Sequence, residues 1–371
     1  MSALVSGSLK TDSQLVVVIL AGGQGTRFWP MSRTAKPKQF LPLSAHSDKT
    51  LIQQTVIRTS ELGIKTSVLV VTAESQVALV KEQVPEAAIL AEPVAKNTAA
   101  SLAFAAEFVK SQVGDVPMLC LPSDHVIENL SAMKSVFLQG IELARTENVL
   151  VTFGIAPTHP ETGFGYIQRG ASLDRADCYK VKAFVEKPNK EKAKEYLDAR
   201  TYLWNSGMFV WRPSVFLGEL STYMPKTAQA LASLSASFGS KEIDTLVRSQ
   251  FANLDSISID YGVLEKAQNV VVVAAADFGW SDVGSWDAWA EHVAKSGSLD
   301  TSEAVQRGDV FIKDCPGSAV FAQSRFVAAI GLENVVIVET PDAVLVCSRE
   351  KSQDVKAIVD FLKQTKRETL L

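Results

Sequence analysis

A glycine-rich loop followed by lysines lies near the start of the chain. Residues 21–27 read Ala-Gly-Gly-Gln-Gly-Thr-Arg, and Lys36 and Lys38 flank Pro37 shortly afterwards. Glycines let backbone N–H groups approach a phosphate closely, and fixed cations neutralise the charge of a polyphosphate during transfer. The loop therefore predicts a polyphosphate site. A turn that only reverses the chain, with its cations in solvent, accounts for the same letters equally well.

Two common phosphate-binding loops do not fit this segment. The dinucleotide pattern G-x-G-x-x-G is met by Gly23 and Gly25 but has Phe28 where the third glycine belongs, which disfavours an NAD-dependent dehydrogenase. The P-loop pattern requires Gly-Lys-Ser/Thr, which this loop lacks. The phosphate chemistry therefore belongs to another class of site.

The elements around the loop predict an α/β fold with a doubly wound, Rossmann-like mixed sheet. Residues 15–20 form an apolar, β-branched run typical of a strand buried on both faces. Strand patterns at 67–72, 118–121 and 149–153 alternate with helix patterns at 50–62, 97–110 and 133–145, with Asn97 expected as a helix cap. Ligands bind at the carboxyl ends of such strands, which places the loop where a ligand is expected.

The pattern changes after residue 154. Strands are expected at 162–167 and 179–185 with a helix at 190–199, as a mixed or antiparallel extension of the sheet. Beyond residue 296 come short strands at 309–312, 319–322, 335–339 and 343–347 and a helix near 352–363, which predict a small β-rich, β-helix-like domain. We therefore expect a catalytic domain over residues 1–295 and a C-terminal domain over 296–371, the latter with a role in assembly.

Composition excludes several classes of protein. The 371 residues carry 37 Lys and Arg against 41 Asp and Glu, so any phosphate site must be a local basic cluster, and nucleic-acid binding is disfavoured. The four cysteines form no C-x-x-C pair, which indicates a reducing cytoplasm, and the four histidines, including His46, show no metal spacing. The apolar runs are of strand length, so we expect neither a cleaved signal nor a membrane span.

Further polar residues have both a functional and a plain structural interpretation. Asp124 follows a predicted strand, and Asp282 lies in a Gly/Ser/Trp turn; each alone is typical of a turn or a cap. Glu186 and Lys187 alone suit a solvated surface. Glu92, Asn97 and Thr98 surround a predicted helix start and could serve only capping.

A series of motifs resembles the sugar-nucleotide pyrophosphorylases, and among them the mannose-1-phosphate guanylyltransferases. Together they span roughly residues 15 to 290, in the order of that family. The motifs are L-A-G-G-x-G-T-R-F-W-P-M-S-R with K-P-K-Q-F, then E-P-V-A-K-N-T-A at 92–99, L-P-S-D-H at 121–125, F-V-E-K-P at 184–188, W-N-S-G-M-F at 204–209, S-I-D-Y-G at 258–262 and W-S-D-V-G-S-W at 280–286.

The resemblance implies a reaction and a set of site residues. GTP and α-D-mannose 1-phosphate are expected to give GDP-mannose and pyrophosphate, with Mg²⁺ or another divalent cation held by Asp124 and Asp282. Arg27, Lys38, Asp124 and Asp282 are the expected catalytic residues. The nucleotide is expected on Leu20, Ala21, Gly22, Gly23, Gly25, Thr26, Arg27, Lys38, Glu92, Asn97, Thr98, Ser123 and Asp124, and the sugar phosphate on Gly163, Tyr166, Glu186, Lys187, Asn205 and Asp260.

Alternatives from the same family and from another class remain open. A related enzyme with another base or sugar, such as glucose 1-phosphate thymidylyltransferase, is disfavoured by Trp29, Asn97 and the W-N-S-G-M-F segment. A catalytically silent regulatory subunit that senses GDP-mannose would not need the intact Arg27 and Lys38. We expect a homodimer without nucleic-acid or membrane partners.

Overall fold

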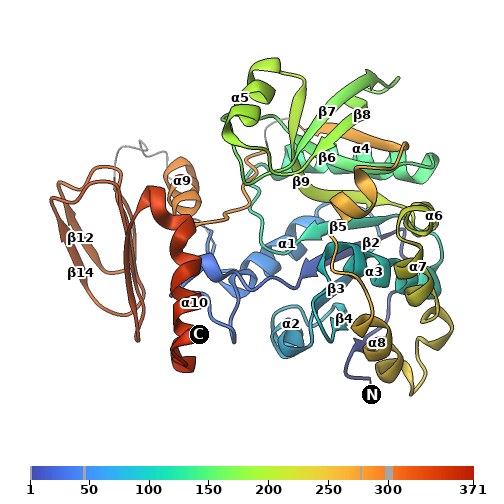
Figure 1. The fold of residues 1–371 in the computed structure, drawn as a ribbon, viewed down its shortest axis with the longest axis horizontal. Coiled ribbons are helices and arrows are strands. Elements are labelled where there is room, and N and C mark those ends of the chain that lie inside the picture. The colour runs from blue at the N-terminus through green and yellow to red at the C-terminus, as the bar shows by residue number, and fades with distance from the viewer. Residues whose placement is uncertain (1, 45–46, 276–277, 297–303) are drawn as a thin grey trace. The chain divides into compact units, whose positions relative to one another are not determined.

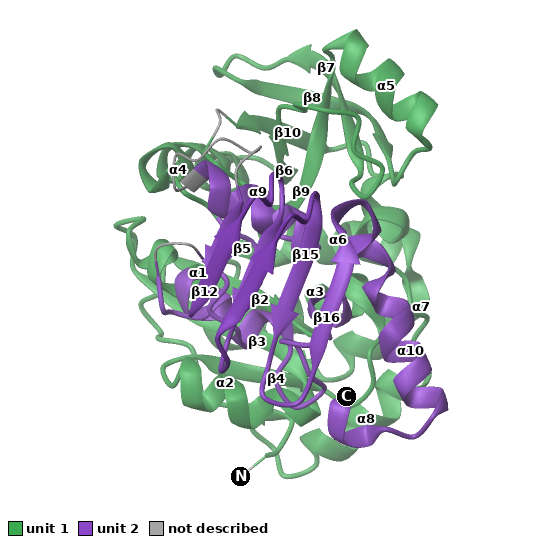
Figure 2. Ribbon diagram, turned by 90° about the vertical axis from the view of Figure 1, so that its left-hand side faces the viewer, with its two compact units in different colours: residues 1–22, 55–123, 127–280 green, residues 23–54, 124–126, 281–371 purple. Residues whose placement is uncertain are grey.

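The computed structural model describes residues 2–44, 47–275, 278–296 and 304–371, so His46 lies outside the described residues. The chain divides into two compact units, each built from separate stretches of sequence (Figure 2). The first unit comprises residues 1–22, 55–123 and 127–280, and the second comprises 23–54, 124–126 and 281–371. The second unit thus combines the basic loop with the C-terminal region. The predicted domain boundary at 295/296 stays a prediction.

The first unit contains a mixed sheet in the order β1-β4-β3-β2-β5-β9-β6-β10-β8-β7 (Figure 1). Strands β4, β3, β2 and β5 are parallel, with Ile19 of β2 opposite Val70 of β3 and Leu121 of β5. The apolar run in β2, Leu15–Ala21, is almost wholly buried because the sheet is covered on both faces. The predicted doubly wound α/β fold is confirmed.

Strand β9, Tyr202–Trp211, joins the parallel part of the sheet to its antiparallel extension. It runs antiparallel to β5, β6 and β7. Strand β9 was not predicted, because Asn205 and Gly207 interrupt its apolar pattern. Helices α6 to α8 were not predicted either. Helices α3, α6, α7 and α8 contribute Phe104, Phe216, Leu231 and Phe251 to the main core beside the sheet.

The second unit contains the expected β-rich C-terminal region. Strands β11, β13 and β15 pair in parallel, β12 pairs in parallel with β14, and β16 adds antiparallel to β15. Stacked short parallel strands of this kind are typical of a β-helix. Within the described residues, no helix is long and apolar enough to cross a membrane.

The bounds of the elements are as follows. The helices are α1 Leu51–Ser60, α2 Val77–Gln83, α3 Asn97–Val113, α4 Leu130–Thr146, α5 Lys190–Ala199, α6 Pro213–Tyr223, α7 Pro225–Ala232, α8 Ile243–Ala252, α9 Trp286–Ser296 and α10 Lys356–Gln364. The strands are β1 Val5–Ser6, β2 Leu15–Ala21, β3 Thr66–Ala73, β4 Ala88–Glu92, β5 Met118–Pro122, β6 Leu150–Ile155, β7 Tyr166–Ser172, β8 Cys178–Val185, β9 Tyr202–Trp211, β10 Val270–Ala275, β11 Val305–Arg307, β12 Val310–Lys313, β13 Ala319–Ala322, β14 Val327–Ile330, β15 Val335–Glu339 and β16 Val344–Ser348.

Candidate functional site

The basic loop folds back on itself in the second unit, and Gly25 makes this possible. Its φ of 59° lies in the left-handed region, and a Cβ atom there would stand 2.3 Å from Cβ of Lys38. The Gly25 carbonyl accepts hydrogen bonds from Phe28 N at 3.0 Å and Ser32 Oγ at 2.7 Å. Gly25 is therefore required to bring Lys38 against the loop, in addition to its predicted role beside phosphate.

Lys38 is the centre of a charged cluster in the second unit. Its Nζ lies 2.9 Å from Oδ2 of Asp124 and donates to the carbonyl of Asp282 at 2.6 Å. The Lys38 side chain is only 5% exposed, and Nζ stands 5.4 Å from the ring centre of Phe28. Three of the four predicted catalytic residues therefore meet in this unit, while the fourth, Arg27, is exposed.

The charge of Lys38 acts directly on Asp124. Desolvation opposes ionisation of this carboxyl, but the charges of Lys38 and His125 outweigh it, and the pKa of Asp124 is lowered from its ordinary value. Asp124 is therefore a carboxylate at neutral pH. His125 directly follows this aspartate in the L-P-S-D-H motif and adds to the electrostatic effect of Lys38.

Asp124 and Asp282 lie on neighbouring segments of the second unit. Val126 and Ser281 form an antiparallel bridge, with N···O distances of 2.8 and 3.0 Å, two residues after the first aspartate and one before the second. Oδ1 of Asp282 accepts from the N–H of Gly284 at 3.1 Å. Among the residues described, no three His, Cys, Asp or Glu side chains form a metal-binding group. Two oxygen donors suit Mg²⁺, which keeps several waters and shares substrate phosphates.

The predicted nucleotide residues of the first unit gather where β2 and β4 end. A Cβ on Gly22 would lie 3.5 Å from Oε2 of Glu92, and the N–H of Ser123 donates to the carbonyl of Leu20 at 3.1 Å. Ser101 Oγ donates to Oε1 of Glu92 at 2.7 Å. Burial, only partly offset by this hydrogen bond, raises the pKa of Glu92 to about 7. Glu92 can therefore change its charge near neutral pH.

The start of helix α3 differs in detail from the expectation. The cap position falls on Lys96, and Asn97 instead begins the helix with a left-handed φ of 65°. Oδ1 of Asn97 accepts from the N–H of Thr98 at 2.8 Å, and Thr98 Oγ1 accepts from the N–H of Ile259 at 2.8 Å. The predicted capping role of Asn97 was therefore wrong in its position, because the backbone turns one residue earlier than the pattern suggested.

The predicted sugar residues of the first unit form a second polar group. Asn205 Nδ2 donates to Oδ1 of Asp260 at 3.0 Å, and the N–H of Asn205 donates to the carbonyl of Gly165 at 2.8 Å. A Cβ on Gly165 would stand 2.6 Å from Oε2 of Glu186, which forms an ion pair with Lys187. Asn205 and Glu186 thus lie beside Gly165, and Asp260 joins this group through its hydrogen bond with Asn205.

Electrostatics distinguish Asp260 from an ordinary surface carboxylate. Burial, with the nearby charge of Glu186, raises the pKa of Asp260 to about 6. Asp260 can therefore hold a proton just below neutral pH. Lys187 remains largely solvent-exposed, with 60% of its side chain accessible.

Glu161 organises the loop before β7 and was missed by the sequence interpretation. Its Oε1 accepts from the N–H of Gly163 at 2.6 Å, and its carbonyl accepts from the hydroxyl of Tyr166 at 2.9 Å. Glu161 therefore links two predicted sugar residues. The only available signal was the short spacing of Glu161 from Gly163, which is typical of a local turn.

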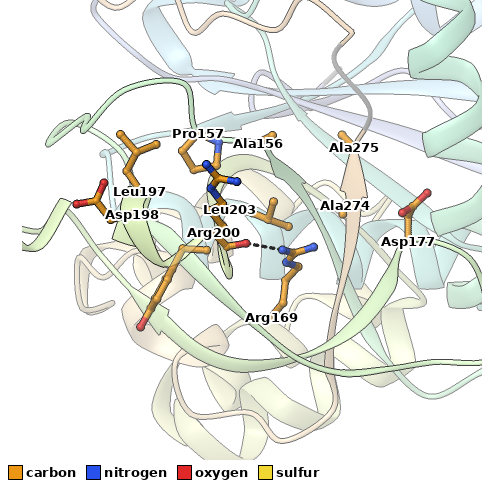
Figure 3. Close-up of a pocket in the computed structure, with 11 residues that line it drawn as sticks. Ala156, Pro157, Arg169, Asp177, Leu197, Asp198, Arg200, Leu203, Ala274 and Ala275 are labelled. Atoms are coloured by element: carbon orange, nitrogen blue, oxygen red, sulfur yellow. Dashed lines mark hydrogen bonds between the residues drawn. The ribbon is translucent and has the colours of Figure 1, made fainter. Parts of the chain in front are cut away.

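A cavity of about 710 Å³ in the first unit is lined by none of the predicted site residues (Figure 3). Arg169 and Arg200 stand at its centre, and the guanidinium of Arg169 donates to the carbonyl of Arg200 at 2.6 Å. Leu197, Leu203 and neighbouring alanines form apolar walls. The predicted site residues therefore lie outside the lining of this cavity.

Known proteins are similar to this chain over most of its length. Residues 16–297 match the Nucleotidyl transferase family, and residues 308–362 match the MannoseP isomerase/GMP-like beta-helix domain. The chain is 42% identical over 364 residues to proteins of Klebsiella pneumoniae and Escherichia coli, each called mannose-1-phosphate guanylyltransferase, and covers 75% of their length with 95% of its own. A solved structure from Thermus thermophilus, described as mannose-1-phosphate geranyltransferase, is similar with a TM-score of 0.84 and 32% identity, over 94% of this chain and 99% of that one.

Proposed function

The chain belongs to the nucleotidyl transferase family, and on this premise we propose that it transfers GMP from GTP to α-D-mannose 1-phosphate. The products are GDP-mannose and pyrophosphate. The names of the bacterial relatives, at 42% identity over 95% of the chain, support this choice of base and sugar. The observation that carries the proposal in the structure is the Lys38–Asp124–Asp282 cluster beside the glycine loop.

The reaction needs no protein nucleophile. A phosphate oxygen of the sugar phosphate attacks the α-phosphorus of GTP in line, the bond to the β-phosphate oxygen breaks, and pyrophosphate leaves with the electron pair. Catalysis therefore rests on positioning and on neutralising charge. Lys38 and the exposed Arg27 hold the triphosphate with backbone N–H groups of the glycine loop, Gly22, Gly23 and Gly25. Leu20, Ala21, Thr26 and Ser123 complete the proposed set of nucleotide-binding residues.

A divalent cation fits the pair Asp124 and Asp282. Both are carboxylates on bridged segments, and the pKa of Asp124 is lowered, so an oxygen ligand is available at neutral pH. A bound Mg²⁺ supplies neutralisation of phosphate charge. Lys38 holds Asp124 by an ion pair and fixes the direction of its carboxylate.

The first unit supplies the groups that select base and sugar. A carboxylate of Glu92 accepts from N1–H and N2–H of guanine, which adenine lacks, and Asn97 and Thr98 flank it at the start of α3. Lys187 holds the phosphate of the sugar phosphate. Glu186, Asn205 and Asp260 accept and donate to sugar hydroxyls, with Gly163 and Tyr166 beside them.

A pyrophosphate-release assay tests the proposal. Four nucleoside triphosphates are crossed with mannose 1-phosphate and glucose 1-phosphate, with and without Mg²⁺. We expect the highest kcat/KM for GTP with mannose 1-phosphate and a requirement for the metal. A higher value for another pair would assign a different base or sugar, and no release with any pair, together with tight GDP-mannose binding, would assign a sensing subunit.

The cellular location of the protein and its oligomeric state are also proposals. The four cysteines are free, which suits a reducing cytoplasm where nucleoside triphosphates are available. A homodimer remains a prediction, and a monomeric mass by light scattering would exclude it.

A further inference from the structure

The far C-terminal end of the chain contacts the basic loop within the second unit. The indole Nε1 of Trp29 donates to the carbonyl of Leu370 at 2.9 Å. Trp29 is 7% exposed, so this hydrogen bond is largely shielded from water. Trp29 is two residues from Arg27, and the bond therefore fixes the loop close to a predicted triphosphate ligand.

An ion pair also joins the loop to the C-terminal region, residues 304–371. NH2 of Arg33 lies 2.7 Å from Oδ1 of Asp342, which stands in the turn between β15 and β16. The Arg33 side chain is 15% exposed, and its guanidinium carbon lies 5.6 Å from the ring centre of Trp29. Asp342 therefore holds an arginine that in turn covers the anchored tryptophan.

The backbone of the loop is held by tryptophans of helix α9. Trp286 Nε1 donates to the carbonyl of Trp29 at 3.0 Å, and the rings of Trp286 and Phe28 are 4.9 Å apart. Trp286 also packs on Phe321 of β13, at 6.0 Å between ring centres. The residues directly after Arg27 thus share one core with the C-terminal strands.

The segment after Lys38 is fixed in the same manner. NH1 of Arg307 in β11 donates to the carbonyls of Pro42 at 2.8 Å and Ser44 at 3.2 Å. Trp289 Nε1 donates to the carbonyl of Leu43 at 3.0 Å. Side chains from beyond residue 285 therefore anchor the chain on both sides of Lys38.

We propose that the C-terminal region, residues 304–371, is the positioning element of the triphosphate loop, with Asp342 and the Leu370 carbonyl as positioning groups for Arg27 and Lys38. These groups touch neither substrate nor metal in this scheme; they act through Arg33 and Trp29. The inference rests on the proposed function and gives the C-terminal region a task beyond assembly. A loop that is displaced by about 1 Å lowers turnover by up to about a hundredfold, although every catalytic side chain is present.

The test uses full-length variants with a matched control. Asp342→Asn removes the charge of the ion pair, Asp342→Glu keeps it, and Trp29→Phe removes the hydrogen bond to Leu370 while keeping an aromatic ring. Asp360→Asn is the control, because Asp360 is an exposed acid on α10 of the same unit and the change in charge is identical. Each protein is measured for kcat, KM for GTP, thermal midpoint and hydrogen–deuterium exchange over residues 23–36.

We expect kcat/KM for GTP to fall about tenfold in Asp342→Asn and in Trp29→Phe, with faster exchange in the loop. Asp342→Glu should recover most of the activity, and Asp360→Asn should match the wild type. The thermal midpoint of Asp342→Asn should stay within about 2 °C of wild type, because the Asp342 side chain is 47% exposed.

Unchanged kinetics and exchange in Asp342→Asn would overturn the inference, and so would an activity loss fully explained by a lower thermal midpoint. A wild-type chain inactive with GTP and mannose 1-phosphate would instead refute the proposed function. The exchange comparison between Asp342→Asn and Asp360→Asn would then still decide whether Asp342 orders the loop.

Discussion

Replacement of Glu92 by glutamine removes the charge of a buried carboxyl while nearly preserving its volume. Burial raises the pKa of Glu92 from 4.5 to about 7, so the folded chain keeps a proton that an unfolded chain releases. The free energy of unfolding of the wild type therefore falls as pH rises from about 4.5 to about 7. At about 1.4 kcal/mol for each pKa unit, the ionised carboxylate costs about 3 kcal/mol at pH 8.

Glu92→Gln should therefore gain stability relative to the wild type as the pH rises. Urea denaturation of both proteins between pH 5 and pH 8 measures the difference. We expect the advantage of the variant to grow by roughly 2 to 3 kcal/mol across this range, since the glutamine does not ionise. The hydrogen bond from Ser101 is available to both side chains, so it does not contribute to the change with pH.

The same variant should bind guanine less well, because a charged acceptor is replaced by a neutral amide. We expect kcat/KM for GTP at pH 8 to fall roughly 10- to 100-fold, with KM for GTP in the wild type rising as the pH falls below 7. A stability difference independent of pH would refute the argument from burial. Unchanged selectivity for GTP over ATP would refute the role of Glu92 in base recognition but leave the burial argument intact.

Three further substitutions test the second unit. Lys38→Met should lower turnover by orders of magnitude and raise the pKa of Asp124, because the lysine charge that opposes desolvation is lost; near-normal pyrophosphate release with an intact circular dichroism spectrum would contradict the role. Gly25→Ala should reduce GTP binding more than tenfold, because the added Cβ meets Lys38 at 2.3 Å; wild-type KM for GTP would show that the loop relaxes freely. Glu339→Gln should lower the thermal midpoint more at pH 7 than at pH 2. Burial would raise the pKa of Glu339, but hydrogen bonds from Ser324 and from the N–H groups of Gln323 and Arg325 hold it at about 2, so its stabilisation is lost as pH falls from about 4.5 through about 2. An equal effect at both pH values would contradict this.

The sequence pattern was sufficient to predict the fold class, whereas the chemistry of the loop stays a prediction. The apolar run before the glycines becomes the buried strand β2, and the short strands after residue 304 form the expected β-rich region. Strand β9 was missed because Asn205 and Gly207 break the apolar pattern, and its place between β5 and β6 depends on tertiary pairing.

The polar contacts of the site were only partly predictable. Residue type indicated that Lys38 would bind phosphate, but its ion pair with Asp124, 86 residues away, follows from the tertiary fold. Arg33 was known only as a letter of the motif, and its contact with Asp342 joins residues that are 309 positions apart. No periodic pattern connects such distant residues, so the anchoring of the loop emerges only from the structure.

The composition of the second unit has a consequence for the order of synthesis and folding. Phe28 and Trp29 are synthesised about 250 residues before Trp286. The hydrogen bond from Trp29 to the carbonyl of Leu370 joins residues that are 341 positions apart. The first unit can bury its sheet earlier, whereas the loop keeps apolar side chains exposed until Trp286 and the residues up to Leu370 have been synthesised. Contacts between residues so far apart in sequence form slowly. Nascent and truncated chains therefore expose an apolar segment, which favours chaperone binding and aggregation. The loop therefore becomes ordered only after the distant segments that hold it have been synthesised.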